Sequence, residues 1–359
     1  MARKRSEADS DKFDQLSGSI HVGVDVHKKT YHVATRGSGS EIVTWVCPAH
    51  PEGLMQRLEQ IKDRIVQIVY EAGPTGFCLA RALQVAGYPI MVVAPSRMPR
   101  PVTRHSKTDR LDCKRLAEYS SKGMLLPVTI PSQIEESERS IIRLRHQTMD
   151  NLRKTKQRIK SFLLFHGIEE PQGLTKWSKK AQQELLSLPL NLDLRFTLRF
   201  LVRELAHQEG FLKRITIQLK RLAQTEKHDR TMENLQSIPG VGLLTAITFH
   251  LEVFRPSRFK SSEQLTSYLG LAPGVRQSGE TSRGGSILPA GQKRLRSMLV
   301  EAAWTWQRRD PGIGKAYRRL LGQTGLAQKA IVALARKLAV VLWRLSIEQR
   351  PYRMAQVAG

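Results

Sequence analysis

The sequence predicts an α/β part at the N-terminal end of the chain, followed by α-helical parts. Three observations lead to this division. Short apolar runs alternate with helical patterns from residue 20 to about 130, heptad stripes occupy much of 133–228, and the remainder resembles a compact helical domain. Strands that alternate with helices form a mostly parallel or mixed sheet whose faces are covered.

The elements of the α/β part are short and follow one another closely. Turn residues separate the apolar runs, and the apolar spacing changes between the periods of a strand and of a helix. The predicted strands are residues 21–26, 30–36, 41–46, 65–70 and 90–93, and the predicted helices are residues 51–61 and 76–86.

Two heptad stripes predict a pair of long helices. The stronger stripe contains Leu201, Leu205, Gln208, Leu212, Ile215, Leu219 and Leu222, and the weaker one contains Ile141, Leu144, Thr148, Leu152, Thr155, Ile159 and Phe162. Steps of four and three residues are typical of a coiled-coil seam. Because Pro171, Gly173 and Pro189 break the segment between them, we expect an antiparallel hairpin or a coiled coil between subunits.

These patterns give four expected domains. Residues 1–18 are polar and charged and are predicted to form a flexible arm. The α/β domain follows over 19–132, and the helical coiled-coil region covers 133–230. The expected all-helical C-terminal domain covers 231–359 and ends in a helix over 326–347.

The composition favours a polyanionic partner. Lys and Arg total 58 against 32 Asp and Glu, a formal net charge of +26. Nucleic acid is the first choice and an anionic membrane surface the second. No membrane span is expected, because charged residues interrupt the most apolar late stretch, residues 330–345. Three cysteines without metal-ligand spacing predict a cytoplasmic protein.

The first long helix is strongly basic. Its cations are Arg139, Arg143, Arg145, Arg153, Lys154, Lys156, Arg158 and Lys160, and Asp150 is the acid among them. A solvated helix face is the usual explanation of such a charge run. Because so one-sided a set would repel itself, we favour contact with nucleic-acid phosphates.

Four carboxylates stand where acidic side chains are hard to explain structurally. Asp25 interrupts one apolar run and Glu71 ends another, while Asp109 and Asp112 are three apart and share a face of a helix. Phosphodiester chemistry uses two divalent ions about 4 Å apart, which prefer carboxylate oxygens. Taken singly, each acid is better explained as a turn or surface residue. Taken together, they predict a metal site.

Three segments resemble the N-terminal signatures of the insertion-sequence-110 transposases, which include the insertion-sequence-1111 subgroup and the pilin-gene invertases. They are Gly-Val-Asp-Val-His-Lys at 23–28, Tyr-Glu-Ala-Gly-Pro-Thr-Gly at 70–76 and Lys-Thr-Asp-Arg-Leu-Asp at 107–112. The resemblance extends from about residue 20 to 350. It implies a RuvC-like (RNase H) fold whose DEDD tetrad, here Asp25, Glu71, Asp109 and Asp112, holds Mg²⁺ or Mn²⁺.

A Pro-Gly-x-Gly turn at 239–242 precedes an apolar helical segment. With Gly240 and Gly242, such a turn exposes backbone N–H groups that can hold a phosphate oxygen without reading sequence. It looks like a helix-hairpin-helix element. A plain turn between helices is the alternative, and the basic chain favours the DNA-binding interpretation.

The segment 268–296 resembles the C-terminal domain of the same transposases, and this implies that Ser278 is a catalytic serine. Ser286 is the alternative, and Ser282 is a weaker one. Residues 288–292 depart from the usual family pattern. Without the resemblance, a Ser/Gly loop would be the better explanation. The nearby cations that we expect to hold phosphate oxygens are Arg276, Arg283, Lys293, Arg294 and Arg296.

The resemblance implies a bacterial, nucleoid-associated recombinase that moves its own insertion sequence. Ser278 would attack a phosphate of donor or target double-stranded DNA, and a structured guide RNA (bridge RNA) would pair with both. We expect a homodimer, with a tetramer in the synaptic complex. The alternatives are a metal-dependent nuclease of the Holliday-junction type without a serine intermediate, and a non-catalytic nucleic-acid-binding protein.

Overall fold

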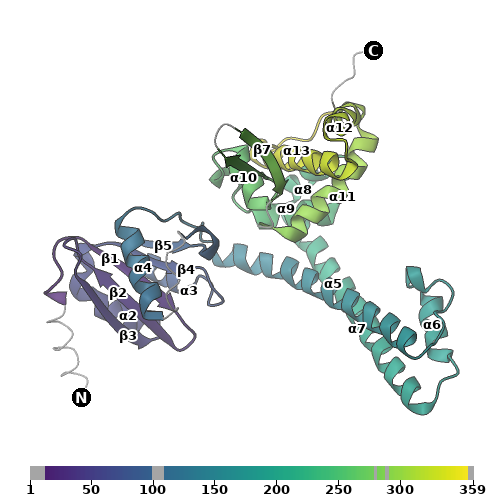
Figure 1. Cartoon of the computed structure of the whole chain (residues 1–359), viewed down its shortest axis with the longest axis horizontal. Helices are drawn as coiled ribbons and strands as arrows, with labels where there is room; N and C mark the ends of the chain where they lie inside the picture. The colour runs from purple at the N-terminus through teal and green to yellow at the C-terminus, as the bar shows by residue number, and fades with distance from the viewer. Residues whose placement is uncertain (1–12, 99–108, 279–280, 288–290, 355–359) are drawn as a thin grey trace. The chain divides into compact units, whose positions relative to one another are not determined.

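The computed structural model describes residues 13–98, 109–278, 281–287 and 291–354. The chain divides into two compact units, Met1–Ser132 and Gln133–Gly359 (Figure 1). The first unit is mixed α/β, and the second is mainly helical. The predicted fold class is therefore confirmed at this level.

The first unit is built on a five-stranded sheet with the order β3-β2-β1-β4-β5. Strands β1 (Ile20–Val26), β2 (Thr30–Arg36) and β3 (Ile42–Pro48) form an antiparallel meander. Strands β4 (Ile65–Glu71) and β5 (Ile90–Val93) then extend the sheet parallel to β1. The mixed sheet that the alternating pattern predicts is therefore present.

Helices cover both faces of this sheet. One face packs against α2 (Pro51–Leu58) and α3 (Cys78–Val85) in a core of apolar side chains. The opposite face packs against α4 (Asp109–Ser121). Phe13 and Leu16 are buried in the first core, so this end of the predicted 1–18 arm is packed onto the domain. Residues 1–12 lie outside the described residues.

Most predicted element boundaries in this unit are correct to within two residues. Strands β2 and β5 match the prediction, and β3 ends two residues later than expected. The predicted helix over 51–61 is divided: α2 ends at Leu58 and the 3-10 segment η1 (Glu59–Arg64) continues it. The tighter turns of this segment lead directly into β4 at Ile65.

Helix α4 approaches β1 very closely at Gly23. A Cβ atom on Gly23 would lie 2.1 Å from the carbonyl oxygen of Cys113 and 2.6 Å from the amide nitrogen of Ala117. Neither backbone atom can move without moving the helix. Glycine at this position therefore sets the distance between α4 and the sheet.

The second unit begins with a long antiparallel helical hairpin (Figure 1). Helices α5 (Gln133–Phe165) and α7 (Leu192–Ala223) pair along their length, and α6 (Lys179–Ser187) lies between them in the chain. The bonds from Arg145 to Thr216 and from Thr155 to Glu204 set the antiparallel register. Of the two arrangements predicted from the heptads, the hairpin within one chain is therefore the one observed.

The hairpin has a separate apolar core at each end. Ile159 and Leu163 pack with Leu198 and Leu205 at the end that carries α6. At the other end, Ile142, Leu219 and Ala223 join the core of the C-terminal helices. Beside the core at the α6 end the seam is partly polar, since Glu204 accepts hydrogen bonds from Thr155 at 3.0 Å and Gln208 at 2.9 Å.

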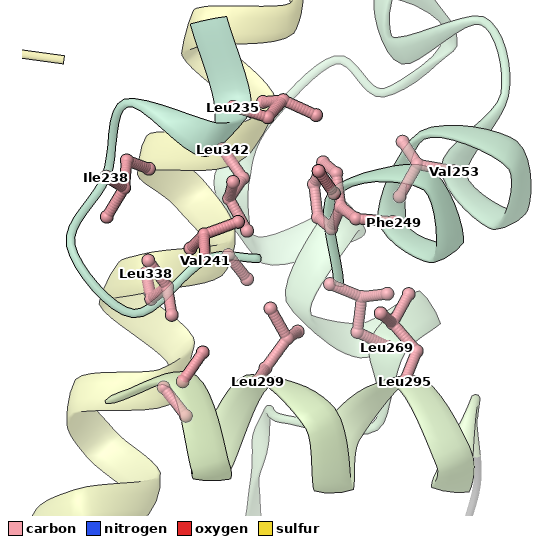
Figure 2. Close-up of a cluster of buried hydrophobic side chains, with 14 of the residues drawn as sticks. Leu235, Ile238, Val241, Phe249, Val253, Leu269, Leu295, Leu299, Leu338 and Leu342 are labelled. Carbon is pink, nitrogen blue, oxygen red and sulfur yellow. The ribbon is translucent and has the colours of Figure 1, made fainter. Parts of the chain in front are cut away.

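The C-terminal helices pack around one apolar core (Figure 2). Their bounds are α8 Asp229–Gln236, α9 Leu243–Val253, α10 Ser262–Leu269, α11 Lys293–Arg309, α12 Pro311–Thr324 and α13 Ala327–Glu348. Phe249 and Trp306 are fully buried at its centre, and α13 contributes Leu338 and Leu342. No helix in the described part of the chain is long and apolar enough to cross a membrane.

The prediction of an all-helical C-terminal domain is wrong in one segment. Strands β6 (Pro273–Ser278) and β7 (Thr281–Ile287) form a two-stranded antiparallel ribbon. Paired glycines and several serine and threonine residues make this stretch a poor helix former. Its few apolar residues give too weak an alternation to identify strands from the sequence.

The contact at Gly23 predicts an unequal response to two glycine substitutions. Gly23→Ala should lower the free energy of unfolding by about 1–3 kcal/mol, because the added methyl group overpacks the contact with α4. Gly53→Ala in α2 is the matched control, since its Cβ would meet nothing within 4 Å. It should raise stability by up to about 1 kcal/mol. Chemical denaturation measures both, and equal stability of the two variants would contradict the packing described here.

Candidate active site

Asp25 and Glu71 lie at the same edge of the sheet. Strands β1 and β4 are parallel, and Val24 pairs with Tyr70 at the end of their ladder. Asp25 and Glu71 are the next residue on each strand. Because neighbouring parallel strands end at one edge, the backbone brings these two acidic residues side by side.

Helix α4 runs antiparallel to β1, so its N-terminal end reaches this edge. His21 Nδ1 lies 2.9 Å from Ser120 Oγ near the end of the helix. Gly23 contacts Cys113 and Ala117 one to two turns earlier. Asp25, two residues further along β1, is close enough to Cys113 to influence its ionisation. Residues nearer the C-terminal end of β1 thus lie next to residues nearer the N-terminal end of α4.

Asp25 and Glu71 also share the sheet face that α4 covers. Residues two apart on a strand point to the same side. Asp25 follows Gly23, which contacts α4, by two residues, and Glu71 follows Val69, which packs with Leu116 of α4, by two residues. The predicted tetrad comes from three secondary-structure elements. The structure brings the ends of β1 and β4 and the first turn of α4 to one edge of the sheet.

The other two predicted carboxylates belong to that first turn. Asp109 is the first residue of α4, and its side chain lies outside the described residues. The Asp112 carboxylate lies 3.6 Å from Arg115 Nη1 and is 39% exposed. Both acids thus lie in the first turn of α4, at the end of the helix that approaches Asp25, and the predicted helix through this pair is present.

The surroundings of Asp25 are partly shielded from solvent. Its side chain is 23% exposed, and its Oδ2 lies 3.0 Å from His27 Nε2. Burial raises the pKa of the Cys113 thiol to about 11, and the negative charge of Asp25 adds to the shift. The Asp25 carboxylate is therefore partly buried near a neutral thiol.

Carboxylate oxygens are the donors that Mg²⁺ and Mn²⁺ prefer, so the chemistry of this edge fits such ions. Among the side chains that the structure describes, no group of three or more His, Cys, Asp or Glu is arranged to hold a metal ion. The Asp109 side chain is not part of that set. The metal role of Asp25, Glu71, Asp109 and Asp112 stays a prediction.

Ser278 stands in a strand, and the Ser/Gly loop considered as the alternative is not observed there. It is the last residue of β6 and pairs with Thr281 of β7, while Arg276 pairs with Arg283. Ser286 lies near the other end of the ribbon in β7. The side chains of the ribbon residues 275–287 lie outside the described part of the chain.

The two glycines of the Pro-Gly-x-Gly turn differ in their surroundings. Gly240 has a φ of 93°, and its Cβ would lie 2.6 Å from the carbonyl oxygen of Ala302 in α11. Packing against α11 therefore accounts for glycine at 240. Gly242 caps α9, is exposed, and would place its Cβ in open space. The predicted phosphate contact is consistent with the open side of Gly242.

Two family models match this chain. One, of the DEDD transposases of the IS110 type and described as Transposase, matches residues 22–167. The other, described as Transposase IS116/IS110/IS902 family, matches residues 232–318. The putative transposase y4qE of Sinorhizobium fredii (strain NBRC 101917 / NGR234) is 31% identical over 92% of this chain and 89% of its own length.

The chain belongs to the IS116/IS110/IS902 family of transposases. The transposase for insertion sequence element IS1533 of Leptospira borgpetersenii is 30% identical over 94% of this chain and 99% of its own. That for IS1111A of Coxiella burnetii (strain RSA 493 / Nine Mile phase I) is 26% identical over 76% and 75%. The predicted family and the prediction of an enzyme are confirmed, and transposases act on DNA.

The basic helix of this transposase is less one-sided in three dimensions than in sequence. Acids from other elements pair with many of its cations: Arg139 and Arg143 with Glu252, Arg158 with Glu204, and Lys160 with Glu170. Self-repulsion is therefore a weaker argument for phosphate contact than the sequence suggests. The contact itself stays a prediction for Arg143, Arg153, Lys154 and Lys156.

Some predicted phosphate-binding cations of the transposase also make internal contacts. Arg153 lies 2.8 Å from Asp150, and Arg294 pairs with the same carboxylate. Arg296 donates to the carbonyl oxygen of Gly270 at 2.8 Å. Lys293 begins α11 beside them. Arg294 and Arg296 thus lie in the first turn of α11, next to the ribbon in the chain, and Asp150 links Arg153 of α5 to Arg294.

Sequence reasoning missed Gly23 and Cys113, which set the geometry around Asp25. The available signal was the alternation of His21, Gly23 and Asp25, which assigns all three to one face of a strand. A glycine in the middle of such a face indicates the close approach of another backbone.

The contact between α4 and β1 predicts which cysteine of the transposase reacts. Cys78 is exposed, whereas Cys47 and Cys113 are buried with pKa values raised to about 11. Since the thiolate is the reactive form, roughly one thousandth of each buried thiol is ionised at pH 8. Disulfide-exchange labelling at pH 8 should therefore modify Cys78 first and the other two only after denaturation.

Mass spectrometry identifies the labelled cysteine, and Cys78→Ser provides the control with no fast-reacting thiol. Labelling of Cys113 in the folded protein at the rate of Cys78 would show that α4 does not cover β1.

Proposed function

We propose that this transposase is a DNA recombinase whose active site has two parts. Asp25, Glu71, Asp109 and Asp112 hold Mg²⁺ or Mn²⁺, and Ser278 supplies the nucleophile. The observation that carries the proposal is the meeting of β1, β4 and the first turn of α4 at one edge of the sheet. A buried strand that ends in an acid beside a second such strand has little structural reason to do so.

The carboxylate edge has the chemical character that the proposal needs. When bound, divalent ions neutralise charge on the attacking and leaving oxygens of a phosphodiester. The protein's own residues would hold and orient these ions. Asp25 and Glu71 would supply carboxylate oxygens from the strand ends, and Asp112 would supply one from the helix. His27, at 3.0 Å from Asp25 Oδ2, orients that carboxylate from outside.

Ser278 performs the covalent step in this proposal. Its Oγ forms a bond to the DNA phosphorus while the bond from phosphorus to the leaving nucleotide oxygen breaks. The serine hydroxyl loses its proton, and the leaving oxygen gains one. Attack by the terminal hydroxyl of the other strand reverses these changes, joins donor to target and frees the serine.

The register of the ribbon supports a phosphate near Ser278. Arg276 and Arg283 are directly opposite one another, two residues from Ser278 and Thr281. Like charges in directly opposite positions destabilise an antiparallel pair. A bound phosphate oxygen removes that repulsion and accepts hydrogen bonds from both guanidinium groups.

The remaining assignments belong to the same proposal. The order of the five strands supports a RuvC-like fold for 19–132. Residues 133–230 are the coiled-coil region, and 231–359 are the transposase domain with a helix-hairpin-helix-like turn. A structured guide RNA pairs with donor and target DNA, and the net charge of +26 suits both polyanions. The working assembly is a dimer that becomes a tetramer on synapsis.

Asp25→Asn tests the carboxylate half of the site. Since loss of an outer-shell partner alone costs roughly 10- to 100-fold, loss of Asp25 should lower the rate of DNA cleavage by more than about 100-fold. Mg²⁺ should also raise the melting temperature of the wild type and leave that of Asp25→Asn unchanged. Asp63→Asn, at an exposed acid in η1, is the control and should behave as the wild type. Full cleavage by Asp25→Asn would refute the metal site.

Ser278→Ala tests the serine half. The wild type incubated with its DNA substrate should yield a protein–DNA adduct that survives detergent, because the phosphoserine bond is covalent. The adduct should be absent with Ser278→Ala and present with Ser286→Ala. Cleavage by Ser278→Ala, together with no adduct from the wild type, would instead indicate a nuclease that uses water.

A further inference from the structure

The outer face of α7 carries a stripe of exposed apolar side chains, which we name the aromatic stripe: Leu192, Phe196, Phe200 and Phe211. Their exposed fractions are 81%, 64%, 56% and 41%. The rings of Phe196 and Phe200 are 4.7 Å apart. Large apolar side chains exposed in a row usually mark a binding surface.

The aromatic stripe faces away from α5. Residues at positions i and i+2 of a helix point about 200° apart, that is, to nearly opposite sides. Phe196 and Phe200 each stand two residues from Leu198, which is buried in the seam with α5. Helix α6 contacts α7 on another side, through Gln182 and Glu209. The stripe is therefore not an extension of the hairpin core.

Positive charge accompanies the aromatic stripe. Arg199, Arg203 and Arg214 are exposed, and none has an acidic partner among the described residues. The Arg214 guanidinium lies 4.8 Å from the centre of the Phe211 ring. The acids of this part of α7 are engaged elsewhere, since Glu204 accepts from Thr155 and Arg158 and Glu209 accepts from Gln182.

Exposed aromatic and cationic side chains also occur on the neighbouring side of α5. Lys154, Arg158, Phe162, Phe165 and His166 line an open hollow of about 580 Å³ near the end of this helix. Arg158 Nη1 donates to Glu204 Oε2 at 3.0 Å, and Glu204 follows Phe200 by one turn of α7. Aromatic rings and cations thus extend from α7 around to α5.

The exposed arginines beside the aromatic stripe indicate which class of partner binds there. A second copy that presented the same stripe would bring Arg199 and Arg203 against identical arginines, which repel. Duplex DNA offers phosphates, but its bases are stacked and cannot cover a phenylalanine. Unpaired RNA offers both groups, because its splayed bases stack on aromatic side chains while its phosphates meet arginine.

We propose that the aromatic stripe binds an unpaired segment of RNA, with bases stacked on Phe196 and Phe200 and phosphates held by Arg199 and Arg203. The inference rests on the proposed RNA partner of this transposase. It adds a contact surface on the hairpin, apart from the elements that carry the predicted catalytic residues.

Fluorescence anisotropy with a short unstructured RNA, measured on the full-length protein without Mg²⁺, tests the proposal. Loss of a base–aromatic stack weakens binding by roughly 5- to 150-fold. Phe196→Ala/Phe200→Ala should show such a loss, and Phe196→Leu/Phe200→Leu should show it equally, because leucine preserves apolar area without a ring. Leu144→Ala, at an exposed apolar residue of α5, is the control and should bind as the wild type.

Two outcomes would overturn the proposal. One is undiminished RNA binding by the alanine variant, or recovery of binding by the leucine variant. The other is a change of oligomeric state in sedimentation of the RNA-free alanine variant, which would identify a second copy as the partner. The assay measures no cleavage and uses an unrelated RNA. Failure of strand exchange by a protein that still binds this RNA would therefore count against the proposed function and not against the aromatic stripe.

Discussion

The close contact between α4 and β1 is the constraint on which the carboxylate edge depends. The acids come from three separate elements, and only the approach of the helix to the strand brings the third to the other two. Small groups make that approach possible: Gly23 and Ala34 on the sheet, and Cys113 and Ala117 on the helix. At this point the interface is made of small groups, and it fixes the distance between the helix and the strand.

In the second unit, a buried ion pair has a similar organising role. Arg139 of α5 and Glu252 of α9 lie 3.0 Å apart, and both are almost completely buried. The Arg139 guanidinium also lies over the Phe254 ring, and Tyr268 donates to the carbonyl oxygen of Glu252. A buried pair adds little net stability, but loss of one partner is costly. The pair therefore favours one orientation of the hairpin relative to the C-terminal helices.

The sequence predicts the elements better than their contacts. The strands around Asp25 and Glu71 and the two long helices follow from apolar periodicity, which is a local property. The antiparallel direction of α4 relative to β1 follows from the contacts of His21 with Ser120 and of Gly23 with Cys113 and Ala117, and the alternation in β1 indicates only that another backbone is near. The ribbon around Ser278 was missed because glycine and serine carry too little apolar signal to distinguish a strand from a loop.

Surface charge shows the same limit. The cations of α5 are evident in the sequence, but the partners of Arg139 and Arg158 come from helices, at separations of 113 and 46 residues along the chain. The exposed phenylalanines of α7 escaped notice for a related reason. A helix that is apolar on two sides looks like an ordinary core helix until the structure shows that α5 covers one side only.

The two separate cores of the hairpin have a consequence for how the family can vary. Helices α5 and α7 contain 33 and 32 residues, which gives each a length of nearly 50 Å. The stretch between the cores repeats on a heptad, and in α5 its Asp150 pairs with Arg294 of α11. Insertion or deletion of one heptad in each helix would lengthen or shorten the hairpin by about 10 Å and leave both cores intact. The hairpin is in this sense a spacer whose length can change in steps of one heptad.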